Sequence, residues 1–266
     1  MVTGTTAIVG LIGTPILQVK MPSLMNPYFA EQGLDCVLIP MDIGQHAIES
    51  FVATVRGWHN LLGIVVTVPY KQVLAPYMDG LTDRARRFST VNAFRRDKDG
   101  TLHGDMFDGV GFVNALDAKG VGLAGKRAAV IGAGGVASAI TNSLCESGVS
   151  RLLIQDMDTA KQDRLIATLR GAFPAIEIRA GIESVRDLDL LVNGTPVGMN
   201  DDPRLPLSAD LLDTLSPDCF VADVVTAPAM TPFLRLAQQR GCAIQIGTDM
   251  TAPQMLTIAR FLRAAP

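Results

Sequence analysis

The stretch at residues 127–137, Arg-Ala-Ala-Val-Ile-Gly-Ala-Gly-Gly-Val-Ala, constrains the fold of this chain more than any other. Its apolar part, residues 128–131, is too short for a helix and leads directly into glycines, so it predicts a buried parallel strand. Residues 132–137 form a G-x-G-x-x-A pattern, and a segment with helical character follows at 138–147. Strand, glycine-rich turn and helix in this order are typical of dinucleotide-binding α/β folds.

The residue types at this turn match what a dinucleotide needs from a protein backbone. Gly132 permits the tight turn, Gly134 lets backbone N–H groups approach a pyrophosphate, and Ala137 lets the helix pack close to its strand. The helix N-terminus then faces the anion. We expect the whole loop to bind the cofactor, namely Gly132, Ala133, Gly134, Gly135, Val136 and Ala137.

An acidic residue follows at the position that discriminates between dinucleotides. The next expected strand, residues 151–155, ends in Asp156, close to the spacing of about 20 residues expected of the acid that binds the ribose hydroxyls. A carboxylate there accepts a hydrogen bond from a 2′-hydroxyl and repels a 2′-phosphate, and residues 157–159 supply no arginine. The glycine pattern alone also fits a plain strand–turn–helix. Strand, helix and acid together favour a cofactor site, with NAD preferred over NADP.

Composition and charge exclude several other classes of protein. The chain has 266 residues, 48% of them hydrophobic, and a mean hydropathy of +0.29, which is enough core material for two modest domains. A net charge of −3 and a pI near 5.6 argue against a nucleic-acid partner. No apolar run approaches the ~18 residues of a membrane span. The first residues lack the basic region of a signal peptide, so we expect a cytoplasmic protein without a membrane partner.

The sequence predicts no metal site. The four cysteines are widely separated and none belongs to a C-x-x-C pair, while the three histidines show no H-E-x-x-H or similar spacing. We therefore expect reduced core thiols and ordinary surface or loop histidines.

Strands and helices alternate along the whole chain, which predicts two α/β domains with mainly parallel sheets. An Asp-Gly turn at 99–100 between two extended runs predicts one hairpin, residues 90–96 with 101–104. The other expected strands are residues 7–12, 34–40, 61–68, 175–180, 188–192, 220–225 and 243–246. The other expected helices are residues 22–32, 45–56, 82–88, 110–119, 159–170, 232–240 and 250–263.

Several motifs in order along the chain resemble those of the shikimate/quinate dehydrogenase family: Pro69-Tyr70-Lys71, Asn92, Asp-Gly-Val-Gly-Phe at 108–112, the glycine loop, residues 193–199 and Gln254. The resemblance covers nearly the whole length. It implies a substrate-binding and catalytic domain at residues 1–107 plus 243–266, and a Rossmann NAD-binding domain at residues 108–242. A C-terminal helix would return to the first domain. The implied reaction moves a hydride between a nicotinamide and a ring hydroxyl or ketone.

The resemblance also implies roles for individual residues. Lys71 matches the family's catalytic lysine and Asp108 its partner aspartate. The implied substrate-binding residues are Thr67, Asn92 and Gln254, and the implied cofactor contacts beyond the glycine loop and Asp156 are Thr195, Pro196, Gly198, Met199, Val224 and Gly247. Simpler interpretations stay open. A lysine is usually a solvated surface charge, an aspartate before a helix can be an N-cap, and buried amides often serve core hydrogen bonds.

The chain departs from the family pattern around the substrate. The family's first loop carries two serines that hold the substrate carboxylate, and the matching positions here are Val19 and Met21. The asparagine of the family's N-V-T is Val65, the N-T before the aspartate is 106–107, Met-Phe, and the tyrosine of a late D-x-x-Y motif is Thr226. A site built on hydrogen bonds loses strongly when they are absent, so we expect weak shikimate turnover or a different substrate. Gln18 or Lys20 are candidates to replace the carboxylate contact.

The sequence thus predicts an NAD-dependent alcohol dehydrogenase, a monomer or homodimer, acting on shikimate, quinate or a related small cyclic hydroxy acid. The alternative is an NAD-binding sensor or regulatory protein with little catalysis, which the altered first loop suggests. The retained Lys71 and Asp108 argue against the sensor, because a protein that only binds has no need of a proton-transfer pair.

Overall fold

A computed structural model describes residues 2–17 and 19–265, which form two compact units. Unit 1 comprises Met1–Phe107 with Gln254–Pro266, and unit 2 comprises Asp108–Pro253. The sequence placed residues 243–253 with the first unit. They belong to unit 2 because β12 (Ile244–Gln245) pairs in parallel with β11 (Phe220–Asp223) and extends the second sheet.

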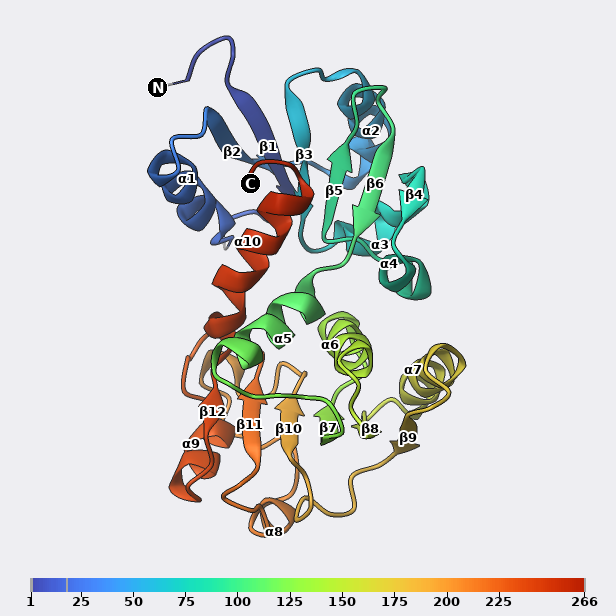
Figure 1. Cartoon of the computed structure of the whole chain (residues 1–266), viewed down its shortest axis with the longest axis vertical. Coiled ribbons are helices and arrows are strands. Elements are labelled where there is room, and N and C mark those ends of the chain that lie inside the picture. The colour runs from blue at the N-terminus through green and yellow to red at the C-terminus, as the bar shows by residue number, and fades with distance from the viewer. Residues whose placement is uncertain (1, 18, 266) are drawn as a thin grey trace. The chain divides into compact units, whose positions relative to one another are not determined.

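Unit 1 is built on a six-stranded mixed sheet with the order β2-β1-β3-β5-β6-β4 (Figure 1). Its strands are β1 (Ala7–Gly13), β2 (Cys36–Asp42), β3 (Leu61–Val66), β4 (Gly80–Leu81), β5 (Ala93–Arg96) and β6 (Leu102–Asp105). The first three pair in parallel, while β5 joins β3 and β6 as an antiparallel neighbour, as the Asp-Gly turn predicts. Its helices are α1 (Met21–Glu31), α2 (Ile48–Gly57), α3 (Tyr70–Val73), α4 (Asp83–Phe88) and most of α10 (Thr251–Phe261).

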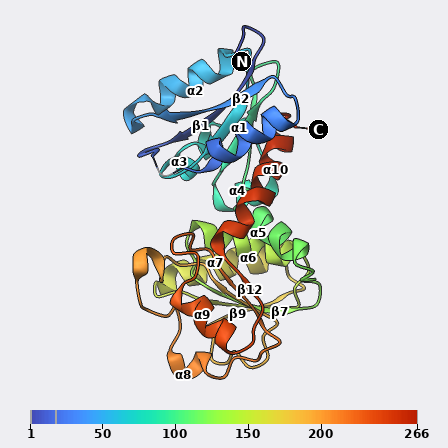
Figure 2. The same cartoon turned by 90° about the vertical axis from the view of Figure 1, so that its left-hand side faces the viewer.

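The two long helices α1 and α10 cover the same face of the first sheet. Met25 and Phe29 of α1 and Ile258 of α10 are buried in one apolar cluster with Val9 and Leu11 of β1. The helix α2 lies over the opposite face (Figure 2). Because a buried side chain of this size contributes roughly 1.5–3 kcal/mol, this cluster is enough to hold the C-terminal helix onto the N-terminal sheet.

Unit 2 is a parallel sheet with the order β12-β11-β10-β7-β8-β9, in which every pairing is parallel. Its remaining strands are β7 (Arg127–Ile131), β8 (Arg151–Gln155), β9 (Glu177–Ala180) and β10 (Leu190–Asn193). The helices α5 (Asp108–Ala118), α6 (Gly135–Glu146) and α7 (Thr159–Ala172) cover one face, and α8 (Ala209–Leu212) and α9 (Pro232–Gln239) the other (Figure 2). The predicted α/β class with two domains is confirmed.

Close packing of α5 on α6 explains a glycine of the Asp-Gly-Val-Gly-Phe motif. A Cβ added at Gly109 would lie 2.0 Å from the backbone oxygen of Ala139 and 2.5 Å from Ser143 Oγ. Those atoms belong to the helix that follows the glycine loop, so any side chain at this position would push α5 away from α6.

Element boundaries differ from the predicted ones in a few places. The helix α6 begins at Gly135 instead of 138, because the extended Gly134 serves as its N-cap residue. The predicted helix 45–56 starts as a 3₁₀ turn, Gln45–Ala47. Short elements at 80–81 and 209–212 were not predicted, since two to four residues carry no readable periodicity. No helix formed by the described residues is long and apolar enough to cross a membrane.

Candidate active site

The glycine loop between β7 and α6 has the geometry that its sequence predicts. Gly132 has a φ of +108°, and a Cβ there would lie 3.0 Å from Thr195 Cγ2 and 3.1 Å from the oxygen of Gly194. Its N–H donates to the oxygen of Gln155 at 2.7 Å, which closes the turn against β8. A glycine is therefore required for backbone conformation and for space.

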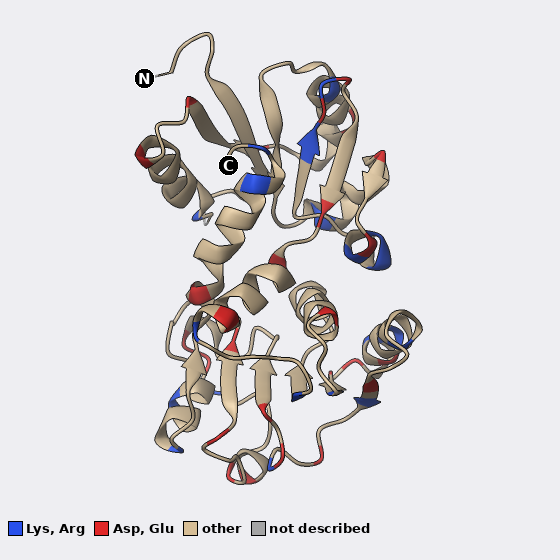
Figure 3. Cartoon of the chain, viewed as in Figure 1, with Lys and Arg blue, Asp and Glu red and all other residues tan. Residues whose placement is uncertain are grey.

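The N-terminus of α6 is open to an anion. Gly134 and Gly135 are exposed, and a Cβ added at either would meet nothing within 4 Å. Among the described residues no side chain caps this helix. The helix carries no Lys or Arg along 135–146 (Figure 3), so its attraction for a phosphate comes from backbone N–H groups and the helix dipole. Bare glycines beside uncapped N–H groups fit the pyrophosphate of a dinucleotide.

Asp156 lies beside this loop, at the carboxyl end of β8. Its Oδ2 accepts a hydrogen bond from the N–H of Ala133 at 2.6 Å, and its Oδ1 accepts one from the N–H of Asp158 at 2.8 Å. Asp158 in turn caps α7 by accepting from the N–H of Lys161. Met157 between the two acids is fully exposed. The end of β8 thus presents a carboxylate fixed to the glycine loop, and no cation directly follows it.

A second loop, residues 194–199, follows β10 and lies against the glycine turn. Thr195 Cγ2 approaches Gly132, and Gly198 takes a φ of +91° in contact with Thr231. Pro196 and Met199 are exposed. The structure therefore brings this loop next to the glycine loop, and the contact with a nicotinamide that the resemblance implies remains a prediction.

The two other expected cofactor residues, Val224 and Gly247, lie against each other. A Cβ added at Gly247 would lie 2.7 Å from the carbonyl carbon of Val224 and 2.3 Å from the oxygen of Val225. Gly247 is buried and opens a 3₁₀ turn, Gly247–Met250. Its packing against the chain after β11 requires the absence of a side chain.

Asp223, at the end of β11, is the aspartate of the D-x-x-Y motif in which Thr226 replaces the tyrosine, and its hydrogen bonds were not predicted. Its side chain is 1% exposed and accepts hydrogen bonds from Asn193, Val225 and Thr231. Burial raises the pKa of this carboxyl, while the hydrogen bonds act against that rise. The sequence signal was an acid at a strand end, but its partners lie 8 and 30 positions away.

In unit 1, Lys71 lies on the short helix α3 directly after Tyr70. Tyr70 is completely buried, its hydroxyl donates to the oxygen of Ile43 at 2.5 Å, and burial raises the pKa of its phenol. Lys71 itself is half-buried, and its backbone oxygen accepts from the N–H of Val91. The tyrosine therefore fixes the turn from which the lysine side chain extends.

Thr67 and Asn92 lie at neighbouring strand ends of unit 1. The Thr67 methyl packs against Gly13, where an added Cβ would be 2.4 Å away. Asn92 is buried, and its Oδ1 accepts a hydrogen bond from the N–H of Phe107 at 2.7 Å. Asn92 thus has a core hydrogen-bonding role, which the sequence left as an alternative. Gln254 is half-buried on α10.

Asp108 is buried and is the first residue of α5, so it lies within the first helical turn. It belongs to unit 2, whereas Lys71 belongs to unit 1. Their pairing remains a prediction.

Four of the departures from the family pattern, Val19, Met21, Val65 and Phe107, lie in or against one apolar cluster of unit 1. Val19 and Met21 are partly buried and pack against the cluster that contains Val65, Phe107 and Met255. The first loop is therefore packed by apolar side chains where the family pattern has hydroxyls. Lys20 is exposed at the position preceding α1, and Gln18 lies outside the described residues.

A buried ion pair beside this cluster was not predicted. Asp105 is 3% exposed and accepts from Arg84 through two parallel hydrogen bonds of 2.8 and 2.6 Å. The Arg84 guanidinium also lies 5.3 Å from the ring centroid of Phe107, which contacts Phe261 at 5.0 Å. The ion pair joins α4 to β6. No local sequence pattern predicts a contact between residues 21 positions apart.

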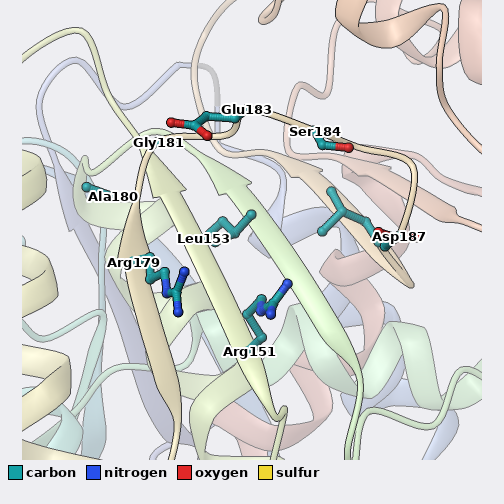
Figure 4. A pocket seen from close by; sticks show the side chains of 9 residues that line it. Arg151, Leu153, Arg179, Ala180, Gly181, Glu183, Ser184 and Asp187 are labelled. Atoms are coloured by element: carbon teal, nitrogen blue, oxygen red, sulfur yellow. The ribbon is translucent and has the colours of Figure 1, made fainter.

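A pocket of about 250 Å³ lies in unit 2, beside β8 and β9 of the second sheet (Figure 4). Arg151, Leu153 and Arg179 project from β8 and β9 on one side, and the loop with Glu183, Ser184 and Asp187 borders the other. Both arginines pair with Glu177, at 3.0 and 2.6 Å. None of the predicted site residues lines this pocket.

Comparisons with known proteins agree with the geometry. Residues 11–94 match the family model described as the shikimate dehydrogenase substrate binding domain. The chain is 36% identical over 260 residues to a protein of Rhodospirillum rubrum named shikimate dehydrogenase (NADP(+)), and the match covers 96% of this chain and 90% of that protein.

Two solved structures share the whole fold. Shikimate 5-dehydrogenase from Listeria monocytogenes, in complex with shikimate and NAD, superposes with a TM-score of 0.93 at 28% identity, covering 99% of this chain and 94% of that one. The ligand-free 5-ketofructose reductase of Gluconobacter sp. strain CHM43 superposes with a TM-score of 0.90 at 26% identity, covering 98% and 94%.

Proposed function

Since the chain belongs to the shikimate dehydrogenase family, we propose that it transfers a hydride reversibly between NAD and a ring hydroxyl or ketone of a small cyclic hydroxy acid such as shikimate or quinate. The chain is an oxidoreductase of the alcohol dehydrogenase type. The observation that carries the proposal is the glycine loop with its open helix N-terminus and the carboxylate of Asp156 fixed beside it.

The proposed mechanism divides the work between the two units. When bound, the nicotinamide would supply the hydride acceptor or donor. In the proposed roles, Lys71 takes the proton from the substrate hydroxyl during oxidation and returns it during reduction, and Asp108 orients the lysine. Thr67, Asn92 and Gln254 hold the remaining hydroxyls. The half-buried position of Lys71, after the fully buried Tyr70, supports this role because a base must combine substrate access with a fixed direction.

The proposed cofactor is NAD, although the Rhodospirillum rubrum relative is named for NADP(+). The support is the carboxylate of Asp156 at the end of β8, followed by the exposed Met157 and by Asp158. Two acids and no cation in this segment disfavour a 2′-phosphate, whereas a carboxylate suits the two ribose hydroxyls. The exposed methionine offers an apolar contact for an adenine face.

The first loop of this chain differs from the family pattern at the positions that hold the shikimate carboxylate, so we expect weak shikimate turnover or a related acid as the better substrate. Val19 and Met21 have no hydroxyl to give a carboxylate, and Lys20 is the cation nearest to them in sequence. A keto sugar is a second candidate, since a structural relative is named as a 5-ketofructose reductase. Exchanging Val19→Ser and Met21→Ser together should raise kcat/KM for shikimate without changing the affinity for NAD.

A turnover panel tests the proposed function. Purified protein is mixed with NAD+ and shikimate, quinate or related cyclic hydroxy acids, and with NADH and 5-ketofructose, while the absorbance of NADH is followed. Turnover of shikimate, quinate or a related cyclic hydroxy acid supports the proposal, whereas turnover of 5-ketofructose alone supports the keto-sugar candidate. Tight NADH binding with no turnover across the panel would instead indicate a sensor.

The Lys71 role needs a matched control. Lys98 is a suitable one, because it is exposed in the hairpin turn of the same unit. Lys71→Ala should abolish most turnover on the active substrate, while Lys98→Ala should leave it unchanged.

A further inference from the structure

A network of buried and partly buried hydrogen bonds links the ends of β10 and β11 to the loop at residues 194–199. Asn193 and Asp223 are register partners on these parallel strands, and their side chains are 0% and 1% exposed. Asn193 Nδ2 donates to Asp223 Oδ1 at 3.0 Å. The same carboxylate accepts from Val225 N–H at 2.9 Å and from Thr231 Oγ1 at 2.7 Å.

The other end of Asn193 holds the loop. Its Oδ1 accepts from the hydroxyl of Thr195 at 2.6 Å and from the Thr195 N–H at 3.1 Å, while its Nδ2 also donates to the oxygen of Val197 at 3.1 Å. The Thr195 hydroxyl then accepts from the N–H of Val197 at 3.2 Å. Every polar atom of the asparagine side chain is thereby committed, and its amide orientation is set by Asp223.

Contacts at both ends of the loop connect this hydrogen-bond network to the glycine turn and to the start of α9. The Thr195 methyl lies against Gly132, at 3.0 Å from a Cβ built there, and Thr231 abuts Gly198 at 3.1 Å from a Cβ built there. Thr231 also caps α9 by accepting from the N–H of Leu234. The loop is therefore held between the glycine turn and the start of α9, and Asp223 is the charge in the middle of the network.

We propose that Asp223 is a positioning residue: through Asn193 and Thr195 it fixes the 194–199 loop at the distance from the glycine turn that holds a nicotinamide ring in place. The inference rests on the proposed function, because that function is what places a nicotinamide beside this loop. Asp223 touches neither the substrate nor the reacting atoms in this role. It acts by presenting only acceptors to three donors, which an amide of the same shape does not do.

The variant Asp223→Asn tests this with a readout that needs no substrate. Hydrogen exchange of the backbone amides at 194–199 is followed by mass spectrometry in the wild type, in Asp223→Asn and in Asp218→Asn. Asp218 is a matched control because it is an exposed aspartate just before the same strand. Exchange in the loop should speed up by about tenfold or more in Asp223→Asn, since hydrogen bonds to a charged acceptor are the stronger ones. It should stay unchanged in the control and in the peptide covering α6.

NADH supplies the second readout. Its affinity, measured by calorimetry, should remain within about threefold of wild type, because the glycine loop and Asp156 are untouched. The rise in nicotinamide fluorescence on binding should be lost, because the ring is no longer held. On an active substrate, kcat should fall by roughly 10- to 100-fold with little change in KM for NAD, as expected of a misplaced reacting group.

A second variant keeps the test decisive if Asp223→Asn fails to fold. Thr195→Val removes one hydroxyl from a partly exposed loop residue, and Thr195→Ser restores it. Faster loop exchange in the valine variant with rescue by serine supports the proposal. Unchanged exchange and unchanged NADH fluorescence in both Asp223→Asn and Thr195→Val would overturn it. Failure of the wild type to bind NADH would overturn the proposed function and the nicotinamide role, but loop exchange would still report whether Asp223 fixes the loop.

Discussion

Replacing Asp156 should change which dinucleotide the protein prefers. The carboxylate is half-buried and is directed to the glycine loop by its bond to Ala133 N–H, so it stands where a cofactor adenosine would lie. In Asp156→Asn the negative charge is lost, and the single amide oxygen can accept from Ala133 or from Asp158 but not from both. The substitution therefore removes the charge at the cost of one backbone hydrogen bond.

The expected size of the preference for NAD over NADP follows from the electrostatic repulsion between Asp156 and a 2′-phosphate. Two unit charges about 4 Å apart interact by about 1 kcal/mol in bulk water and about 4 kcal/mol at the effective dielectric constant of about 20 near a protein surface. The 2′-phosphate carries a charge of about −1.5 to −2, and the strand end is open to water at Met157. An intermediate value of about 2 kcal/mol corresponds to a preference for NAD of roughly 30-fold.

Calorimetric titration with NAD+ and NADP+ measures this preference directly. The ratio of the two dissociation constants should fall from roughly 30 in the wild type toward 1 in Asp156→Asn, and adding Met157→Arg should invert it. Asp158→Asn is the control, because its carboxylate is committed to the start of α7 and to Lys161 at 3.4 Å. A wild type that binds NADP+ as tightly as NAD+, or an unchanged ratio in Asp156→Asn, would refute the reasoning.

Three further predictions concern the base, the glycine loop and pH. Lys71→Ala should lower kcat by about 10²- to 10⁴-fold with the NADH dissociation constant unchanged, and stopped-flow turnover on the active substrate checks this. Gly132→Ala should destabilise the fold by roughly 1–3 kcal/mol in urea unfolding, since it combines a positive φ with a contact, whereas Gly134→Ala should unfold like wild type and lose NADH binding. A hydrogen bond from Arg56 holds the pKa of Asp79 below its usual value, so Asp79 adds stability above its unfolded pKa of ~3.9 that is lost as pH falls through the folded value. Asp79→Asn should therefore cost up to about 1 kcal/mol at neutral pH, with the two unfolding curves converging in acid.

The sequence predicts local parts of the site well because their information is local. The strand, the glycine turn, the helix and the following acid lie within 30 residues, and each step has a steric or electrostatic reason that a single segment can show. The structure places Asp156 against Ala133 of the glycine loop, and its contact with the ribose hydroxyls remains a prediction. The hairpin at β5 and β6 was likewise readable from its Asp-Gly turn.

The contacts that the sequence did not predict depend on strand register and on pairing between residues far apart in the chain. Asn193 and Asp223 meet only because β10 and β11 are aligned residue for residue, and Arg84 meets Asp105 only after β6 returns beside α4. No periodicity in a single strand contains that information. The C-terminal boundary was misplaced for a related reason: β12 has two residues, too few to show which sheet it extends.

In the first loop, the two residues that change the expected substrate specificity also pack against the apolar core of unit 1. Val19 and Met21 do more than remove hydroxyls, because they pack on the cluster that joins α1, α10 and β3. Returning serines there would expose apolar surface beneath the loop and cost roughly 1–3 kcal/mol of stability in addition to any gain in shikimate turnover. The double serine variant therefore tests substrate specificity and core packing at the same time, and its turnover has to be compared with its free energy of unfolding.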